Sequence, residues 1–305
     1  MGLGTNHVTN TTGATFIPEL WSDEIIAAYK SNLVMANLVS KMSFKGKKGD
    51  TLHIPKPTRG SAAAKAASTQ VTLQAATESE VQVLVNKHYE YSRLIEDITE
   101  AQALASLRRF YTSDAGYALA KQVDTDLIQL GRGVKGGDGS ADYNKAVLGG
   151  DGSTLYVDGT NVGTALTDAG IRRVIQTLDD QDVPMDGRVL VVPPSARNTL
   201  MGLARFTEQA FTGETGGGNT IRNGQIGDVY GVKVYVTTNA DTATTNTSRI
   251  AMMFHKDAFV LAEQMGVRSQ TQYKQEYLGT LFTSDMLYGV KELRDEAAIA
   301  IAVPA

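Results

Sequence analysis

The chain contains no cysteine, which excludes disulfide bonds, thiolate catalysis and cysteine-ligated metal sites. Its stability must therefore come from packing and from association with other chains. No apolar stretch approaches the roughly 20 residues that a membrane-spanning helix needs. Residues 1–15 lack the basic and then apolar pattern of a signal peptide, and we expect them to form a flexible polar arm. The cytoplasm is the default compartment.

Positive charge is also scarce, with 29 Lys and Arg against 33 Asp and Glu and a formal net charge of −4. Broad binding of nucleic acid needs a surplus of basic side chains on some face, so it is not expected here. The four histidines are His7, His53, His88 and His255. None has a second ligand at helical spacing, which favours surface or hydrogen-bonded histidines over metal ligands. We predict no metal site and no cofactor.

What the chain does have is the composition of a soluble globular protein, with 305 residues, 42% hydrophobic and 20% charged, and enough length for two lobes. Its most distinctive stretch is residues 81–130. Val81, Val83, Val85 and then two tyrosines fall on alternate positions, which predicts a strand with one buried face. Residues 100–130 contain no proline, which predicts a long helix there; about 27 helical residues would span about 40 Å at roughly 1.5 Å per residue.

This strand and helix suit an assembly of identical chains. A two-stranded ribbon is marginal in water unless another surface covers it. The apolar residues of the helix spread over more than half of its circumference, so both of its sides should be covered. Because a helix of this length outruns the core of one modest domain, the expected partner is another copy of the same chain.

We predict a projecting ribbon over residues 43–95. A strand at residues 51–54 stops at two prolines, and residues 58–67 have the small, polar composition of an exposed loop tip. Residues 69–75 alternate between polar and apolar positions, which predicts part of the returning strand. Lysines gather at the ribbon base, where they either contact an acidic protein surface or nucleic acid, or protect an edge against aggregation. We favour the protein contact; these lysines are Lys41, Lys45, Lys47, Lys48 and Lys56.

A first helix is predicted after Pro18, because proline suits a helix start. From residue 167 onward the pattern is that of an α/β lobe. Thr167 is the expected N-cap of a helix, a continuous apolar strand follows at residues 188–192, and Ser195 is the expected cap of the next helix. Residues 230–237 alternate as a further strand.

Two segments flank this lobe. Before it, residues 131–163 form a polar, glycine-rich insertion in which short strands are expected. After it, the sequence predicts a buried strand at residues 250–254, a short helix at 256–262 and an alternating segment at 267–277. A final strand is predicted at 288–301, interrupted by the charged residues 291–296. The parts before and after the lobe are expected to form one sheet and helix layer together.

The motifs give little support for catalysis. Gly131, Gly133 and Gly136 have the G-x-G-x-x-G spacing of dinucleotide-binding turns, but that mechanism needs a preceding strand and a following helix. Here the glycines follow a helix and lead into a loop, so coincidence is the better explanation. The chain has no phosphate-loop motif and no G-x-S-x-G serine elbow. The aspartates of the insertion lack the spacing of a calcium loop, and we predict no catalytic residue.

Three motifs accompany the order of the elements. They are FIPELW at residues 16–21, GQIGDVYGV at 224–232, and LYGVKELR at 287–294 followed by EAA at 296–298. In this order the chain resembles the major capsid proteins of tailed bacteriophages, which share the HK97 fold. The resemblance touches most of the chain.

The resemblance implies an α+β, HK97-like capsid fold. Its parts would be an N-terminal arm (1–17), a first helix and connection (18–42), an extended β-hairpin called the E-loop (43–95), a peripheral domain with the spine helix and the glycine-rich insertion (96–166), an α/β axial domain (167–246) and a return to the peripheral domain (247–305). In this family the E-loop lies over a neighbouring subunit, and the axial domain meets its copies around five-fold and six-fold positions.

The implied function is that of a major capsid protein, a non-enzymatic structural protein that self-assembles into an icosahedral head around double-stranded phage DNA. The implied partners are copies of itself in pentamers and hexamers, a portal, and DNA enclosed without sequence-specific contact, with no membrane. A separate scaffolding protein is also implied, because residues 1–17 leave no room for the long scaffold segment with which some relatives begin. The expected location is the virion, after assembly in the host cytoplasm.

The expected contacts between subunits are Lys47, Lys48, Lys56, Lys65, Val81, Val83 and Val85. Some relatives cross-link subunits through a lysine and an asparagine; Lys56 and Lys65 lie in the corresponding element, but no partner is identifiable and cross-linking is not predicted. Two alternatives stay open. One is an encapsulin-like cargo shell with the same fold, and the other, less favoured, is an α/β enzyme that binds a nucleotide at residues 131–136.

Overall fold

A computed structural model describes most of the chain. The described residues are 33–46, 48–57, 60–71, 73, 78–97, 106–134, 147–157, 162–203, 228–243 and 248–305. The predicted N-terminal arm, the helix after Pro18 and residues 135–146 of the glycine-rich insertion lie outside them.

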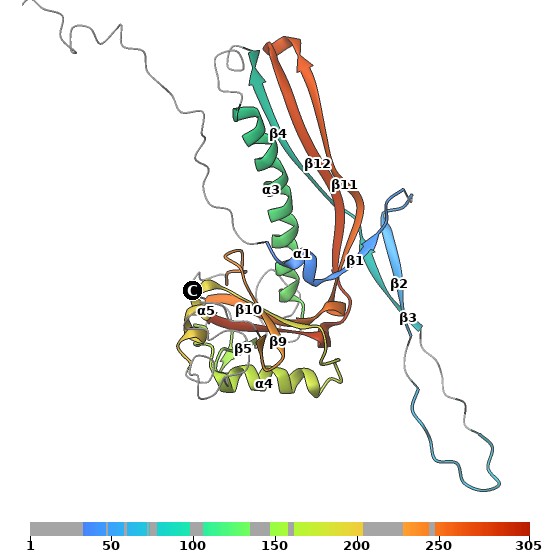
Figure 1. Ribbon diagram of the computed structural model, residues 1–305. Helices are drawn as coiled ribbons and strands as arrows, with labels where there is room; N and C mark the ends of the chain where they lie inside the picture. Colours follow the sequence, from blue (N-terminus) through green and yellow to red (C-terminus); the bar gives the residue numbers. More distant parts are fainter. Residues whose placement is uncertain are drawn as a thin grey trace, which may run out of the picture.

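The body of the subunit is a seven-stranded mixed sheet with the order β6-β5-β13-β10-β7-β9-β8. Its strands are β5 (Val147–Gly149), β6 (Leu155–Tyr156), β7 (Arg188–Val192), β8 (Asp228–Val229), β9 (Val232–Val236), β10 (Ser248–His255) and β13 (Ala298–Pro304). Figure 1 shows α4 (Asp168–Asp179) on one side of this sheet and the lower end of α3 (Ser106–Gln129) on the other. The helix α5 (Pro194–Met201) contacts β7 and β13. Because helices cover the sheet, its central strands are continuous apolar runs rather than alternating ones.

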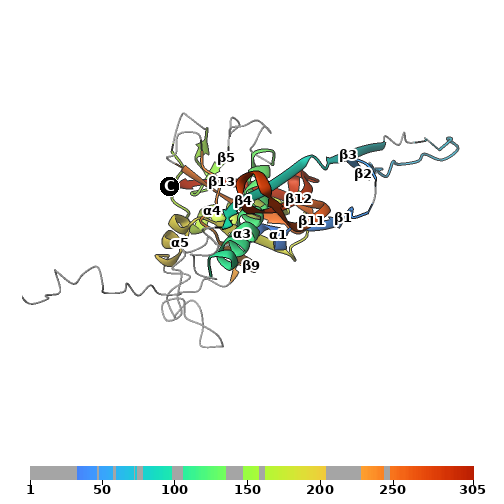
Figure 2. The ribbon, with the colours of Figure 1, turned by 90° about the horizontal axis from the view of Figure 1, so that it is seen from above.

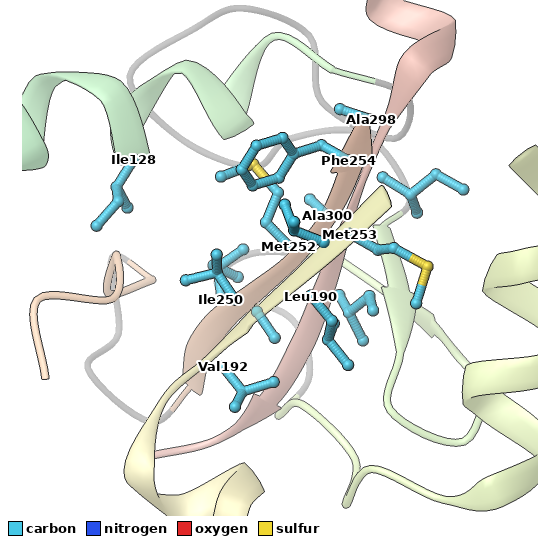
Figure 3. Close-up of a cluster of buried hydrophobic side chains, with 14 of the residues drawn as sticks. Ile128, Leu190, Val192, Ile250, Met252, Met253, Phe254, Ala298 and Ala300 are labelled. Atoms are coloured by element: carbon cyan, nitrogen blue, oxygen red, sulfur yellow. The ribbon is translucent and has the colours of Figure 1, made fainter. Parts of the chain in front are cut away.

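The main hydrophobic core lies on β7, β10 and β13 (Figure 3). Leu190, Met253, Phe254 and Ala300 are fully buried. Ile128 from α3 points toward these strands, which ties the long helix to the body. Each large side chain buried in this way stabilises the fold by about 1.5–3 kcal/mol.

A second sheet, the arm sheet, rises from the body beside α3 (Figures 1 and 2). Its order is β1-β11-β12-β4, with β1 (Ser40–Ser43), β4 (Lys87–Glu96), β11 (Phe259–Lys274) and β12 (Gly279–Glu292). The strands β11 and β12 form a hairpin closed by the 3-10 turn η4 (Gln275–Tyr277). The helix α3 covers one face of this sheet: the Tyr91 hydroxyl donates to Asp114 Oδ2 at 3.1 Å, and the Arg93 guanidinium lies 5.1 Å from the Tyr111 ring centre.

A third, two-stranded sheet is the ribbon, made of β2 (Thr51–Pro57) and β3 (Glu78–Leu84) in antiparallel register. It projects away from the body on the side opposite the C-terminus (Figures 1 and 2). The remaining short elements are α1 (Met35–Leu38), η2 (Leu130–Arg132), η3 (Lys256–Ala258) and η5 (Asp295–Ala297).

Several predicted elements are confirmed. The Thr167 side chain accepts a hydrogen bond from the Gly170 amide at 3.1 Å and caps α4. The strand at residues 188–192 is β7, all of whose residues are buried. The described part of the insertion contains two short strands, β5 and β6, and the strand at 250–254 lies within β10.

The predicted continuous strand after residue 81 is instead two strands in different sheets. β3 pairs with β2, whereas β4 pairs with β12, and the chain changes sheets at Val85 and Asn86. The Val85 amide donates to the Asp50 carbonyl at 2.8 Å, which extends the register of β2 and β3 by one pair before the chain joins β12. The period of two was correct, but alternation alone does not reveal which neighbour each half of a strand will choose.

Four local predictions were wrong. Strand β2 does not stop at Pro55 but runs through Pro55 and Pro57. Because β2 pairs on one side only, the N–H that each proline lacks would have pointed to the free edge, and no hydrogen bond to β3 is lost. The described residues of 69–75 form no strand. Helix α5 has Pro193 at its N-cap, and the Ser195 hydroxyl donates to the Pro304 carbonyl instead. The helix predicted at 256–262 is only the three-residue turn η3.

The C-terminal part divides between the two large sheets. β11 and most of β12 join β1 and β4, as expected for flanking segments of one layer. β10 and β13, however, are central strands of the body sheet and pair with β7 and β5. The final strand predicted at 288–301 is split into the end of β12, the turn η5 and β13.

Candidate assembly surfaces

The outer part of the ribbon is exposed on a sheet of only two strands. Pro55, Lys56 and Pro57 on β2 are exposed, as are the residues 78–80 that pair with them. The described residues 60–71 of the connecting segment are exposed and have no regular structure. Two strands alone are marginal in water, so this part of the molecule is suited to lie on another surface.

The root of the ribbon is held by a small core of its own. Val83 and Val85 are 0% and 6% exposed and pack with Phe44, Val260 and Ala262. These two valines were expected to be buried against a neighbouring subunit. In the structure, the arm sheet of the same chain already covers them. Val81, farther out, is half-buried. The prediction of a valine contact between subunits now concerns Val81 alone.

The predicted lysine contacts are spread along the ribbon. Lys48, Lys56 and Lys65 are exposed at the turn before β2, on β2 and in the connecting segment, whereas Lys47 lies outside the described residues. Two other lysines at the base are engaged within the chain. Lys45 Nζ lies 3.3 Å from Glu263 Oε2, and Lys41 Nζ donates to Asn37 Oδ1 at 3.2 Å. The lysine patch is thus partly satisfied internally, and its exposed members remain contact candidates.

A polar pair crosses the ribbon. His53 Nδ1 and Glu80 Oε2 are 3.0 Å apart, and Gln82 Nε2 donates to Glu80 Oε1 at 2.6 Å. The hydrogen bonds from Gln82 and then His53 hold the pKa of the Glu80 carboxyl below its usual value. These hydrogen bonds hold the side chains of His53, Glu80 and Gln82 together on an exposed face of the ribbon.

The C-terminal half of α3 carries two buried carboxylates, which we call the α3 carboxylates, Asp124 and Asp126. Asp126 accepts from the Tyr288 hydroxyl at 2.6 Å and pairs with Lys87 Nζ at 3.1 Å, which joins α3 to β12 and β4 of the arm sheet. Burial raises the pKa of the Tyr288 hydroxyl, and the neighbouring carboxylate raises it further. The Tyr288 hydroxyl therefore keeps its proton and donates a hydrogen bond to Asp126.

Asp124 faces the body instead. Its Oδ1 accepts from the Val34 and Met35 amides at 3.1 and 2.8 Å at the start of α1, and its Oδ2 accepts from Asn239 Nδ2 at 3.1 Å. Burial raises the pKa of this carboxyl despite those bonds. At the end of the helix, Arg132 makes a bidentate pair with Asp241 at 2.8 and 3.0 Å. The helix is thus tied by carboxylates to both the arm sheet and the body.

A charged trio lies on the face of the arm sheet away from α3. Arg268 Nε and Nη2 donate to the two oxygens of Asp285 at 3.0 and 2.7 Å, and His88 Nε2 lies 3.1 Å from Asp285 Oδ2. The bonds from Arg268 and then His88 lower the pKa of the Asp285 carboxyl. The side chain of Asp285 is only 10% exposed although it lies on an open face, because the side chains of Arg268 and His88 cover it.

The described residues give no support for catalysis. The three described histidines each have a carboxylate neighbour, with His255 beside Asp257, as expected for hydrogen-bonded histidines. No group of three or more potential metal ligands occurs within the described ranges. Gly131 and Gly133 lie in and just after η2, at the end of a helix rather than after a strand. The nucleotide-binding alternative is therefore not favoured.

Sequence reasoning did not single out the α3 carboxylates or the charged trio. A weak signal for the first was present, because Asp124 and Asp126 lie directly beside the apolar Val123 and Leu127 of the predicted helix. For the second no local signal exists, since His88, Arg268 and Asp285 meet only through the pairing of three strands.

A layered body, an arm sheet flanked by one long helix and a projecting ribbon define an HK97-like shell subunit. The profile of a family described as phage capsid protein matches residues 19–303. The chain belongs to this phage capsid protein family.

Solved capsid structures share the fold. A chain of Mycobacterium phage Che8 is 23% identical, with 94% of this chain and 97% of that chain covered and a TM-score of 0.74. The capsid of cyanophage P-SCSP1u is 17% identical, with coverage of 99% and 97% and a TM-score of 0.75. The capsid of cyanophage Pam1 is 13% identical, with coverage of 99% for both chains and a TM-score of 0.73. No curated protein matches the sequence.

Among the helices of the described segments, none has both the length and the apolar character needed to cross a membrane.

Proposed function

We propose that this protein is the major subunit of an icosahedral phage head, in which copies arranged as pentamers and hexamers enclose double-stranded DNA without reading its sequence. Its role is structural and not catalytic, because its copies pack beside one another to form the shell. A separate scaffolding protein and a portal complete the assembly in the host cytoplasm. Family membership supports the shell role.

One observation carries the proposal within the chain itself. The outer half of the ribbon, from Pro55 to Pro57 and from Glu78 to Glu80, is exposed on an isolated two-stranded sheet. A strand pair of this kind gains stability only when a third surface covers it. A neighbouring copy supplies that surface in a closed shell, and the exposed Lys48, Lys56 and Lys65 lie where such a contact would form.

Truncation of the ribbon tests this role. The bond from the Val85 amide to the Asp50 carbonyl makes Ile54 and Val81 a hydrogen-bonded pair in the same register, so residues 55–80 can be replaced by the two-residue turn Asn-Gly. The root core around Val83 and Val85 is kept. We expect a folded subunit with a near-native thermal midpoint that no longer forms closed particles by electron microscopy.

The matched control is Ala63→Ser, which changes an exposed residue of the connecting segment that is not a contact candidate, does not shorten the ribbon and is expected to assemble normally. Normal particles from the truncated chain would contradict the role of the ribbon in the shell. The contents of purified wild-type particles distinguish the DNA-filled head from a cargo shell: packaged protein without DNA would favour the latter.

A further inference from the structure

The turn between α4 and β7 leaves an Asp-Gly sequence open to solvent. Met185, Asp186 and Gly187 are all exposed, Met185 to 74%. The Asp186 carboxylate forms no hydrogen bond or ion pair with another described residue, and the Gly187 amide donates to none of them. In an Asp-Gly sequence the side-chain carboxyl and the following amide can react with each other. Here both groups are without a competing partner.

The exposure is confined to these three residues, because Arg188 holds the rest of the turn. Its buried guanidinium donates from Nη2 to the Val183 carbonyl at 2.6 Å and from Nε to the Pro184 carbonyl at 2.9 Å. The chain is therefore anchored just before Met185 and again at the start of β7. A chemical change at Asp186 does not require the body sheet to open.

Glycine is the residue that this position demands. Gly187 has φ 80°, in the left-handed region that a larger side chain rarely adopts. In addition, a Cβ at Gly187 would lie only 3.3 Å from His255 Nε2. The amide that follows Asp186 is therefore left without the shielding that a side chain on the next residue would give.

A second Asp-Gly sequence in the described part of the chain shows the opposite arrangement. The Asp151 carboxylate accepts from the amides of Ser153 and Thr154 at 3.2 and 3.0 Å and from their hydroxyls at 3.1 and 2.6 Å. The Thr154 hydroxyl and these other donors lower the pKa of the Asp151 carboxyl, which keeps it ionised and unreactive toward an amide. Gly152 is buried, and its amide donates to the Gly149 carbonyl at 2.9 Å. Both reacting groups are occupied.

We propose that Asp186 is a site of spontaneous modification, at which the folded chain converts aspartate to isoaspartate, whereas Asp151 is protected. The Gly187 nitrogen attacks Asp186 Cγ, and the new C–N bond closes a succinimide ring. The amide proton and the carboxyl oxygen leave as water. A water molecule then adds to the main-chain carbonyl carbon of the ring and breaks its bond to the Gly187 nitrogen. The chain now runs through the Asp186 side chain, and the α-carboxylate is free.

The reaction needs no oxidant, reductant or cofactor, because one water is lost and one is gained. It goes beyond the proposed function and does not depend on it, since all the reacting atoms belong to one chain. The product places a free α-carboxylate on an exposed turn, where an isoaspartate-specific methyltransferase could reach it.

The two Asp-Gly sequences can be compared in one sample. Free full-length subunits are aged in the folded state and, separately, unfolded in urea. Tryptic peptides 174–188 and 146–172 then carry Asp186 and Asp151. Mass spectrometry with a fragmentation method that distinguishes isoaspartate measures the rate at each position. We expect Asp186 to react in the folded subunit at nearly its unfolded rate. Asp151 should react at least about tenfold more slowly than in the unfolded chain, because its hydrogen bonds must open first.

Two variants separate the cause of the difference. Asp186→Glu should abolish isomerisation in peptide 174–188 without changing the thermal midpoint, because the longer side chain would have to close a larger and much less favourable ring. Thr154→Val removes the shortest hydrogen bond to Asp151 and should raise the rate there while leaving that of Asp186 unchanged. Folding that slows Asp186 as strongly as Asp151, or an unmodified Asp186 in aged folded subunits, would overturn the proposal. Particle formation does not enter the measurement, so this failure would leave the shell function standing.

Discussion

At the scale of single residues, carboxylates carry much of the connection between the parts of this subunit. Asp126 binds Tyr288 and Lys87 of the arm sheet, while Asp124, two residues earlier on the same helix, binds the start of α1 and Asn239. A buried carboxylate costs several kcal/mol unless it is well bonded. These two residues therefore specify how α3 lies between the sheets, since any other placement would leave a buried charge without partners.

The charged trio on the arm sheet makes stability depend on pH. Because Arg268 and His88 lower the pKa of Asp285 in the folded state, ionised Asp285 stabilises the fold above the ordinary carboxyl pKa of about 4, and this contribution is lost as the pH falls below it. We expect Asp285→Asn to lower the free energy of unfolding by about 1 kcal/mol at pH 7, a value limited by the exposure of Arg268. At pH 3 the difference from wild type should be smaller.

Denaturant unfolding of both proteins at the two pH values measures this effect. Glu276→Gln, at an exposed carboxylate with no ion pair among the described residues, is the control and should show little difference at either pH. A difference between wild type and Asp285→Asn that grows on acidification would contradict the assignment.

At the scale of elements, glycines show where two segments must touch. Gly170 in the first turn of α4 lies against the loop after β5, and a Cβ there would lie 2.0 Å from the Gly150 carbonyl oxygen. Gly163 is similarly close to the backbone of β13. These contacts give the described part of the glycine-rich insertion a packing role, which composition alone could not distinguish from an irregular loop.

A pair of glycine variants tests this packing role. Gly116 lies inside α3, and no atom lies within 4 Å of the position that an added methyl group would take, so Gly116→Ala should stabilise the protein by about 0.5–1 kcal/mol through helix propensity. Gly170→Ala should destabilise it by about 1–3 kcal/mol, because the loop must move to admit the methyl group. Thermal or denaturant unfolding measures both. Equal effects of the two substitutions would contradict the close contact at Gly170.

Local sequence patterns predicted where helices and strands form better than they predicted which strands pair with each other. Continuous apolar runs found β7 and β10, and the cap at Thr167 found the start of α4. The change of sheet at Val85 was not predictable, because it depends on the Asp50 carbonyl and on Gly289, where a Cβ would lie 2.3 Å from the Leu84 carbonyl oxygen. Burial of Val83 and Val85 by their own chain was missed for the same reason, since strand pairing is set by distant segments.

At the scale of the whole molecule, the subunit combines one compact body with two extensions that a single chain does not cover. The ribbon and the arm hairpin point away from the body in different directions (Figures 1 and 2). The order of elements along the sequence was sufficient to predict the fold class through the resemblance to phage capsid proteins, and the family match bears it out, whereas the arm hairpin was not predicted. The left-handed backbone of Leu278, in the turn between β11 and β12, had no signature in the sequence, because a left-handed leucine is a property of the folded turn.

The exposed connecting segment of the ribbon gives a readout of assembly. Lys65 lies in the described residues 60–71, which are exposed and lack regular structure, and such segments are preferred sites of proteolysis. We expect trypsin to cleave free subunits rapidly after Lys65. In assembled particles the ribbon should lie on a neighbouring copy, so cleavage at this bond should be strongly slowed.

Mass spectrometry of limited digests identifies the cut, and Lys65→Gln provides the control that removes this site without shortening the ribbon. The comparison must use free subunits and particles at equal chain concentration, because the rate then reports accessibility alone. If Lys65 is cut equally fast in both, the ribbon is not covered in the shell, and other surfaces hold the subunits together.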